Sequence, residues 1–188
     1  MPRLFFAINV PLSQEFVNLR RHLQEKTHYD KIVWVNDNLS HLTLRFIGKT
    51  QKENIPVLKK ILHEIAQKNS SFDLNIHQLG LFGSHYCPKV IWLGVENQPL
   101  LLQLASSLEE ELQKAGFVPP EGNFVPHITL GRIKKIDNKK KFSQLIEENQ
   151  PIFHQTINVK DIILYQSHLE KDGPIYTELC NEPLIPIQ

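Results

Sequence analysis

Hydrophobic and polar positions change period several times along this chain, and these changes predict its elements. An apolar run at 4–10, ended by Pro11, is typical of a strand, and apolar positions 12, 16, 19 and 23 then recur at helical spacing. A capping-box pattern at 50–53 and an apolar stripe through 55–65 predict a second helix. Strands are expected on either side of it, at about 41–47 and 72–82.

The second half of the chain repeats this alternation. A strand at 90–95 precedes a helix with an apolar stripe at 101, 104, 108 and 112 that ends near Gly116, and a strand at 127–133 follows. A short lysine-rich helix at 138–149 and closing strands at 152–160, 161–169 and 175–180 complete the pattern, with the turn Asp172-Gly173-Pro174 between the last two. The connections are too short for long parallel crossovers. We therefore expect one α+β domain over residues 1–188, built from two similar lobes.

One tetrapeptide pattern occurs once in each half. His41-Leu42-Thr43-Leu44 returns as His127-Ile128-Thr129-Leu130, and two chance matches of this kind are expected at well below roughly one per cent. Side chains alternate across a strand, so each histidine shares a face with its threonine, about 7 Å away, while the apolar residues enter the core. If the two strands are equivalent in the two lobes, their polar faces line one cleft.

Two imidazoles and two hydroxyls on one cleft suit the cleavage of a phosphodiester. Histidine titrates near pH 6.5, so one ring can act as a base and the other as an acid at neutral pH. The hydroxyls of Thr43 and Thr129 can donate to the non-bridging phosphate oxygens. This chemistry requires neither a metal nor another cofactor.

Each of these residues has a plainer interpretation. A lone histidine in a strand is usually a surface or hydrogen-bonded core residue, and threonine is a common strand former. The duplication favours catalysis over that interpretation. The other histidines lack such a partner, and His85 with Cys87 offers only two possible metal ligands, fewer than zinc takes.

Composition narrows the class of partner and the compartment. With 21 basic and 20 acidic residues the net charge is +1, which excludes the strongly basic footprint of a protein that coats nucleic acid, so RNA contact should be local. The two cysteines indicate a reducing compartment, and no stretch approaches the roughly 18 apolar residues of a membrane span. We expect a cytoplasmic monomer that does not contact a membrane.

Together with the residues that flank the doubled motif, the sequence resembles the two-histidine phosphoesterase superfamily. Within it, the sequence resembles the RNA 2′,3′-cyclic phosphodiesterases once named 2′-5′ RNA ligases. The segments that carry the resemblance are 3–8, 41–48, 88–95, 126–132, 167–169 and 173–176. The resemblance implies a bilobal fold with a pseudo-twofold axis, each lobe an antiparallel sheet backed by helices, and a central cleft. It implies metal-independent hydrolysis of the cyclic phosphate at RNA 3′ ends, or of cyclic nucleotides, to a 2′-phosphate, with weak reversible 2′-5′ joining.

The resemblance also implies individual roles. His41 resembles the general acid and His127 the base, with the reverse assignment as the alternative because the site is nearly symmetric. Arg132 resembles a phosphate-binding arginine. Strict alternation puts Arg132 on the face opposite His127, unless Gly131 permits a bulge. Arg45 has the parity of the cleft and is a second phosphate-binding candidate, with a solvated strand face as the alternative. Phe5 is a candidate platform for base stacking, with core packing as the alternative.

Other functions remain as alternatives. An ATP-dependent ligase would need a Lys-x-Asp-Gly motif, but Glu170 stands where that lysine belongs in front of Asp172-Gly173. A related two-histidine phosphodiesterase could act on ADP-ribose 1″,2″-cyclic phosphate or on 2′-5′ oligonucleotides. A catalytically silent RNA- or nucleotide-binding module of the same fold is the alternative from another class.

Overall fold

Nine strands and four α-helices make up the part of the chain that the computed structural model describes, residues 1–84, 86–96, 98–170 and 173–187. The strands are β1 (Arg3–Asn9), β2 (Lys31–Trp34), β3 (His41–Lys49), β4 (Phe72–Ser84), β5 (Cys87–Val95), β6 (His127–Lys135), β7 (Gln155–Val159), β8 (Asp161–Glu170) and β9 (Gly173–Pro183). The helices are α1 (Gln14–Lys26), α2 (Ile55–Ala66), α3 (Pro99–Lys114) and α4 (Lys139–Glu148), with short 3-10 helices η1 (Asp37–Leu39) and η2 (Lys52–Asn54).

The strands form one continuous sheet in the order β7-β4-β5-β6-β3-β1-β8-β9, and β2 pairs with β6 beside this path. All strand pairings are antiparallel among the described residues. The order is symmetrical about its centre, where β3 and β6 meet through the pair Leu42–Ile128. Each lobe is therefore antiparallel, as expected, and the two lobes join edge to edge as halves of one sheet.

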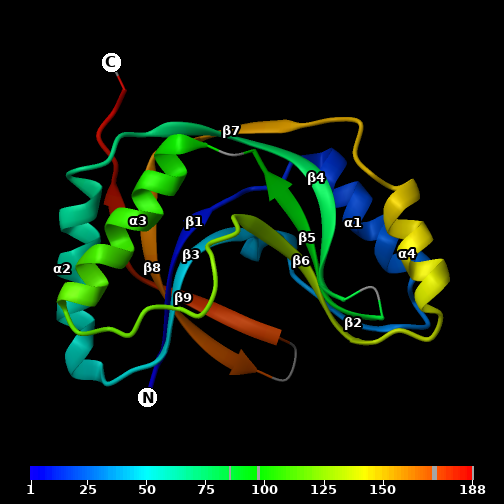
Figure 1. The fold of residues 1–188 in the computed structure, drawn as a ribbon, viewed down its shortest axis with the longest axis horizontal. Helices are drawn as coiled ribbons and strands as arrows, with labels where there is room; N and C mark the ends of the chain where they lie inside the picture. Colours follow the sequence, from blue (N-terminus) through cyan, green and yellow to red (C-terminus); the bar gives the residue numbers. More distant parts are fainter. Residues whose placement is uncertain (85, 97, 171–172, 188) are drawn as a thin grey trace.

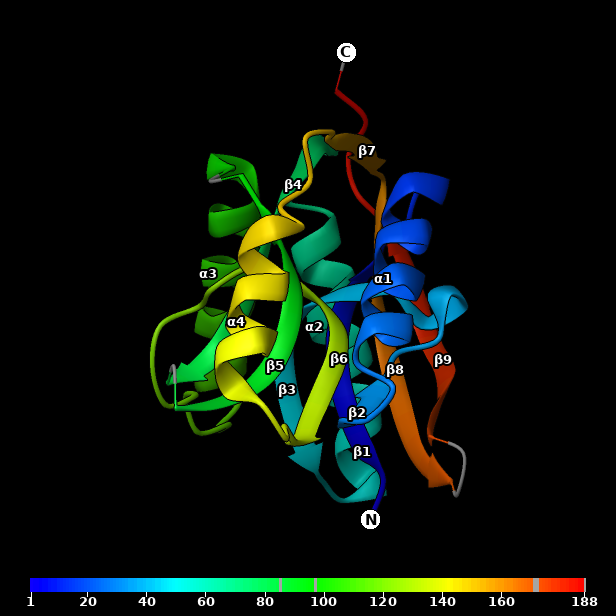
Figure 2. The same cartoon turned by 90° about the vertical axis from the view of Figure 1, so that its right-hand side faces the viewer.

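The helices divide into two pairs at opposite ends of the molecule. In Figure 1, α2 and α3 lie beside β1, β3, β8 and β9, while α1 and α4 lie at the other end; Figure 2 shows α1 and α4 side by side in front of the sheet, with β6 visible between them. α2 contacts α3, β8 and β9, and α3 contacts β3. Each pair contains one helix from each half of the chain, so both halves of the chain contribute to each end of the molecule.

Strand alternation sends the motif residues to two different faces. Leu42, Leu44, Ile128 and Leu130 are buried in the hydrophobic core. The histidines and threonines between them are half-buried on the opposite side of the strands. This is the α+β fold with two similar lobes that the sequence predicts.

Three local predictions differ from the structure. The strand β2 was not expected; it is four residues long and has no fully buried position, so its hydrophobic signal is weak. The capping box at 50–53 does not form: η2 precedes α2, and the Thr50 hydroxyl accepts a hydrogen bond from the Asn54 side chain at 3.0 Å. The last strand is longer than 175–180, and Asp172 of the expected turn lies outside the described residues.

The predicted end of α3 is confirmed. Gly116 has φ +86°, a conformation that costs glycine little, and the Phe117 N–H donates to the Leu112 carbonyl at 3.0 Å. No described helix has the length and apolar character needed to cross a lipid bilayer.

Candidate active site

The two histidine motifs meet at the centre of the sheet. Leu42 of β3 lies opposite Ile128 of β6 in an antiparallel pair. Extending this register by one residue places His41 opposite Thr129 and Thr43 opposite His127, so that each histidine faces the threonine of the other motif. Directly opposite Cβ atoms lie about 5 Å apart and diagonal neighbours about 7–8 Å apart. The two imidazoles therefore lie on one diagonal of this face of the sheet.

Both imidazoles are held in the same way. Nδ1 of His41 is 2.7 Å from the Leu39 carbonyl oxygen, and Nδ1 of His127 is 2.8 Å from the Val125 carbonyl oxygen. Since a carbonyl only accepts, Nδ1 carries the proton and donates in each ring. This tautomer leaves Nε2 of each ring to exchange a proton with a substrate.

The environment lowers the pKa of both imidazoles. Burial, which disfavours the charged form, is the main cause for His41 and for His127. The Leu39 and Val125 carbonyls oppose this effect, while the positive charge of Arg132 lowers both pKa values further. The charge of His127 also lowers the pKa of His41, so the two rings and the guanidinium form one electrostatic cluster.

A β-bulge brings Arg132 to this cluster. Ile91 pairs with Gly131 but Trp92 pairs with Thr129, so Leu130 is an extra residue in β6 and alternation resumes one position late. A Cβ on Gly131 would lie 3.0 Å from Cγ2 of Ile32 and 3.1 Å from Cε3 of Trp34. A side chain at this position would crowd β2. The φ of Gly131 is not in the left-handed region, so space and not backbone conformation is the reason for glycine here.

An equivalent β-bulge in β3 turns Arg45 to the face opposite the two imidazoles. Ala7 pairs with Thr43 and Phe6 with Arg45, so Leu44 is the extra residue and the parity argument for Arg45 is wrong. Arg45 Nε donates to Glu109 of α3 at 2.7 Å. Its Nη2 donates to the carbonyl of Val118, at the start of the loop that leads to His127.

Phe5 packs beneath His41. Phe5 is only 1% exposed, so no base can stack on its ring. Its position fits the alternative interpretation, core packing. Its ring centre lies 5.1 Å from that of His41, 5.3 Å from Tyr165 and 5.0 Å from Tyr176. Phe5 therefore supports one imidazole instead of contacting a base.

Sequence reasoning missed the aromatic residues that enclose the imidazoles. Tyr176 of β9 contacts His41 edge-on, with ring centres 5.2 Å apart, and Phe82 of β4 contacts His127 in the same way at 4.6 Å. Burial raises the pKa of Tyr176, which the nearby Arg132 partly offsets. Tyr176 belongs to a segment that carries the family resemblance, but its place beside His41 depends on the β8–β9 pairing.

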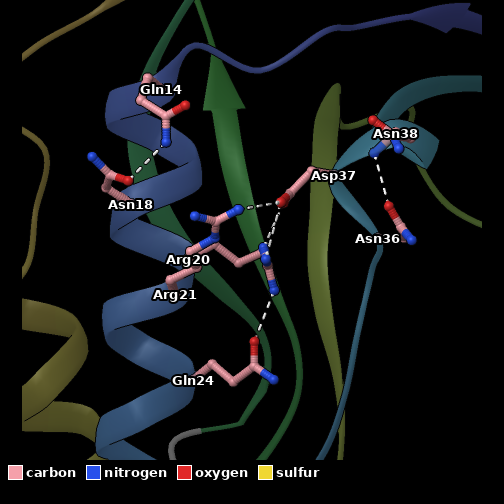
Figure 3. A network of polar contacts seen from close by, with 8 residues as sticks. All are labelled: Gln14, Asn18, Arg20, Arg21, Gln24, Asn36, Asp37 and Asn38. Carbon is pink, nitrogen blue, oxygen red and sulfur yellow. Dashed lines mark hydrogen bonds and ion pairs between the residues drawn. The ribbon is translucent and has the colours of Figure 1, made fainter.

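A polar network holds the loop that leads to His41 (Figure 3). Arg20 of α1 donates to both carboxylate oxygens of Asp37, from Nε at 2.6 Å and from Nη2 at 3.1 Å. The Asn36 side chain accepts from the Asn38 N–H at 3.0 Å, which closes the first turn of η1. Leu39, whose carbonyl orients His41, is the last residue of η1.

A metal site has no support among the described residues. They include no group of three or more His, Cys, Asp or Glu side chains that could hold a metal ion. His85, one of the two ligands considered from the sequence, lies outside the described residues, and Cys87 is an exposed free thiol. Metal independence stays a prediction.

Comparisons with known proteins identify the family. The family described as LigT like Phosphoesterase matches residues 7–92 and again residues 93–176. An RNA 2′,3′-cyclic phosphodiesterase of Methanocaldococcus jannaschii is 33% identical over 93% of this chain and 96% of its own length, and one of Aquifex aeolicus is 37% identical over 77% of both chains.

Solved structures agree with the sequence relatives. The TT0787 protein of Thermus thermophilus has a TM-score of 0.79 at 26% identity, over 99% of this chain and 100% of that one. Escherichia coli LigT complexed with 3′-AMP has a TM-score of 0.72 at 27% identity, over 98% and 99%. The doubled family match covers nearly the whole chain and assigns one histidine motif to each copy, so this protein belongs to the LigT-like phosphoesterase family.

Proposed function

We propose that this protein opens 2′,3′-cyclic phosphates at the 3′ ends of RNA and leaves a 2′-phosphate. The observation that carries the proposal is the pairing of β3 with β6, which sets two imidazoles and two hydroxyls around one position on a sheet face. The relatives named RNA 2′,3′-cyclic phosphodiesterase support this substrate class.

The proposed chemistry is acid–base catalysis by two imidazoles. Nε2 of His127 takes a proton from water as its oxygen attacks phosphorus, and Nε2–H of His41 gives a proton to the departing O3′. The hydroxyls of Thr43 and Thr129 donate to the non-bridging oxygens, and Arg132 compensates the charge that develops on them. The backbone carbonyls hold Nδ1–H of both rings throughout, so each ring exchanges protons through Nε2 alone.

Each half of the chain supplies one histidine, one threonine and strands on both sides of the β3–β6 junction. We therefore propose that residues 1–188 work as one two-lobed unit. We further propose that it acts as a monomer in the cytoplasm, without a metal or another cofactor.

The products from adenosine 2′,3′-cyclic phosphate test the proposal. Chromatography or phosphorus NMR against authentic standards should show 2′-AMP. A predominant 3′-AMP would reject the orientation of the ribose while retaining the two-histidine chemistry. Failure to open both this nucleotide and a cyclic-ended RNA would support the silent binding module. A higher kcat/KM on ADP-ribose 1″,2″-cyclic phosphate or 2′-5′ oligoadenylate would assign the enzyme to that substrate.

A further inference from the structure

Tyr176 reaches the two-histidine site from the outermost strand of its half of the sheet. β9 is separated from β3 by β8 and β1, so a flat sheet would hold the backbones of β9 and β3 about 14 Å apart, at about 4.8 Å per strand. The ring centres of Tyr176 and His41 are nevertheless only 5.2 Å apart, with an angle of 88° between the ring planes. The sheet therefore curves around its cleft face, and this curvature brings a side chain of β9 against a catalytic imidazole.

Phe5 fixes the position of the Tyr176 ring. The two rings pack edge to face, with centres 5.0 Å apart, and Phe5 supports His41 on the same side of the sheet. Tyr165 of β8 stacks on Phe5 as well, at 5.3 Å, and Phe46 of β3 contacts it at 5.5 Å. All of these contacts use the aromatic ring of Tyr176 or of its neighbours, so none of them occupies the Tyr176 hydroxyl.

The Tyr176 hydroxyl has no hydrogen-bond partner among the residues that the structure describes. It is also not enclosed: in the described part of the chain, the fully buried side-chain polar atoms without a partner are Nδ1 of His77 and Nε1 of Trp92. The hydroxyl is therefore open to a ligand in the cleft. Burial raises the pKa of Tyr176, so the phenol keeps its proton at neutral pH and can donate it in a hydrogen bond.

The charges around the hydroxyl distinguish Tyr176 from Tyr165 on the same hairpin. The charge that acts on Tyr176 is the guanidinium of Arg132, which also acts on both imidazoles. The charges that act on Tyr165 are the carboxylates of Glu178 and Asp161. Tyr176 thus faces the cationic cluster in which the phosphate of the proposed substrate lies, whereas Tyr165 faces carboxylates, which repel an anion.

We propose that the Tyr176 hydroxyl donates a hydrogen bond to one non-bridging oxygen of the substrate phosphate. Tyr176 is then a third hydroxyl donor beside Thr43 and Thr129, and it approaches from the side of His41. The inference rests on the proposed function, because it adds a catalytic residue to the same reaction. Negative charge grows on the non-bridging oxygens as water attacks phosphorus, so this hydrogen bond is stronger in the transition state than with the bound substrate and should act on kcat.

Tyr176→Phe tests the hydroxyl, because it keeps the ring that packs on Phe5 and His41. We expect its kcat on adenosine 2′,3′-cyclic phosphate to fall roughly 10²-fold with little change in KM, the size of one lost donor to a developing oxyanion. The pH limbs of kcat/KM and the tautomer of His41 should stay unchanged, since the hydroxyl does not hold the imidazole. Tyr165→Phe removes a hydroxyl from the same hairpin and is the matched control, which should retain the kcat of the unmodified protein.

The two diastereomers of adenosine 2′,3′-cyclic phosphorothioate identify the atom that accepts the hydrogen bond. Each diastereomer replaces one non-bridging oxygen with sulfur, which is a weaker acceptor. Where sulfur takes the place of the oxygen that Tyr176 contacts, the hydroxyl is already worth less, so Tyr176→Phe should lower kcat several-fold less than on the other diastereomer. This comparison is a double-mutant cycle between one side chain and one substrate atom.

The outcomes separate this inference from the proposed function. Full activity of Tyr176→Phe, or an equal loss on both diastereomers, overturns the inference and leaves the proposed function standing. A loss of activity with displaced pH limbs or a mixed His41 tautomer would assign Tyr176 to the positioning of His41, and this result also overturns the hydrogen bond to phosphate. Absence of hydrolysis in the unmodified protein overturns the proposed function itself.

Discussion

The histidines share one backbone interaction but have different neighbours. Each donates from Nδ1 to a carbonyl two residues earlier, yet His41 packs on Phe5 and Tyr176 while His127 packs on Phe82. The common interaction fixes the tautomer of both rings. The different neighbours give the two rings unequal surroundings, while the positive charge of Arg132 lowers the pKa of both.

Removing either imidazole should abolish most of the activity. We expect His41→Ala and His127→Ala each to lower kcat/KM roughly 10²–10⁴-fold, as is typical for a group that transfers a proton. His22→Ala, on the exposed side of α1, is the control and should retain full activity. Circular dichroism should show an intact fold in all three variants. Near-normal turnover in either of the first two would contradict the mechanism.

The pH dependence of kcat/KM should be a bell displaced toward acid. His127 must be neutral and His41 protonated, and burial lowers the pKa of both rings below the ordinary 6.5. Activity is lost on the acid side as pH falls through the lower pKa and on the basic side as pH rises through the higher one, so both limbs should lie below pH 6.5. A bound phosphodiester anion favours imidazolium, so the limbs of kcat should lie at higher pH. A kcat/KM that rises between pH 6.5 and 8 would contradict this prediction.

At the scale of elements, the loop before each histidine is tied to a helix by an arginine. Arg20 of α1 binds Asp37, two residues before Leu39. Arg45 of β3 links Glu109 of α3 to the carbonyl of Val118, at the start of the loop that ends at Val125 and His127. The ion pair with Glu109 compensates the charge of Arg45, so this residue has a structural role away from the proposed phosphate position.

Breaking the Arg20–Asp37 pair should misorient one histidine only. We expect Arg20→Met to lower kcat by about tenfold or more with little change in KM, because small displacements of a catalytic group are costly. Nitrogen NMR should show a mixed tautomer for His41 and an unchanged one for His127, which a general loss of stability would not produce.

Arg21→Met is the matched control for this variant. Arg21 approaches the same carboxylate of Asp37 only at 3.9 Å, and its side chain is 60% exposed. It should behave like the unmodified protein. A change of both histidines in Arg20→Met, or of neither, would contradict a positioning role for Arg20.

At the scale of the molecule, one sheet joins the two halves and the site lies at their junction. Each lobe is covered by one helix from each half of the chain (Figure 1). Each half carries one histidine motif, so neither half holds both catalytic imidazoles. The catalytic groups come from side chains and backbone alone in the proposed mechanism. This mechanism predicts an activity that does not depend on a bound metal ion.

Chelation tests that independence. Activity on adenosine 2′,3′-cyclic phosphate should survive exhaustive EDTA treatment, because two imidazoles supply both proton transfers. Addition of zinc or manganese to the treated protein should give no increase. Loss of activity that zinc or manganese restores would show that ligands were missed, with His85 and Cys87 the first to replace.

The sequence by itself determined the two motif strands and their faces. Alternation along one strand is a local property, so it correctly places Leu42 and Ile128 in the core and the histidines opposite them. Helical periodicity likewise located α1 to α4, and the duplication of the motif indicated two similar lobes.

Only the tertiary structure decided which side chains accompany the histidines. The bulges at Leu44 and Leu130 depend on pairing with β1 and β5, and each reverses the face of the residues that directly follow it. They bring Arg132 and Phe46 to the two ends of the cleft and send Arg45 to Glu109. Neighbouring strands also bury Phe5 and place Tyr176 and Phe82 against the imidazoles. Register is a relation between strands distant in sequence, so the period of one strand does not contain it.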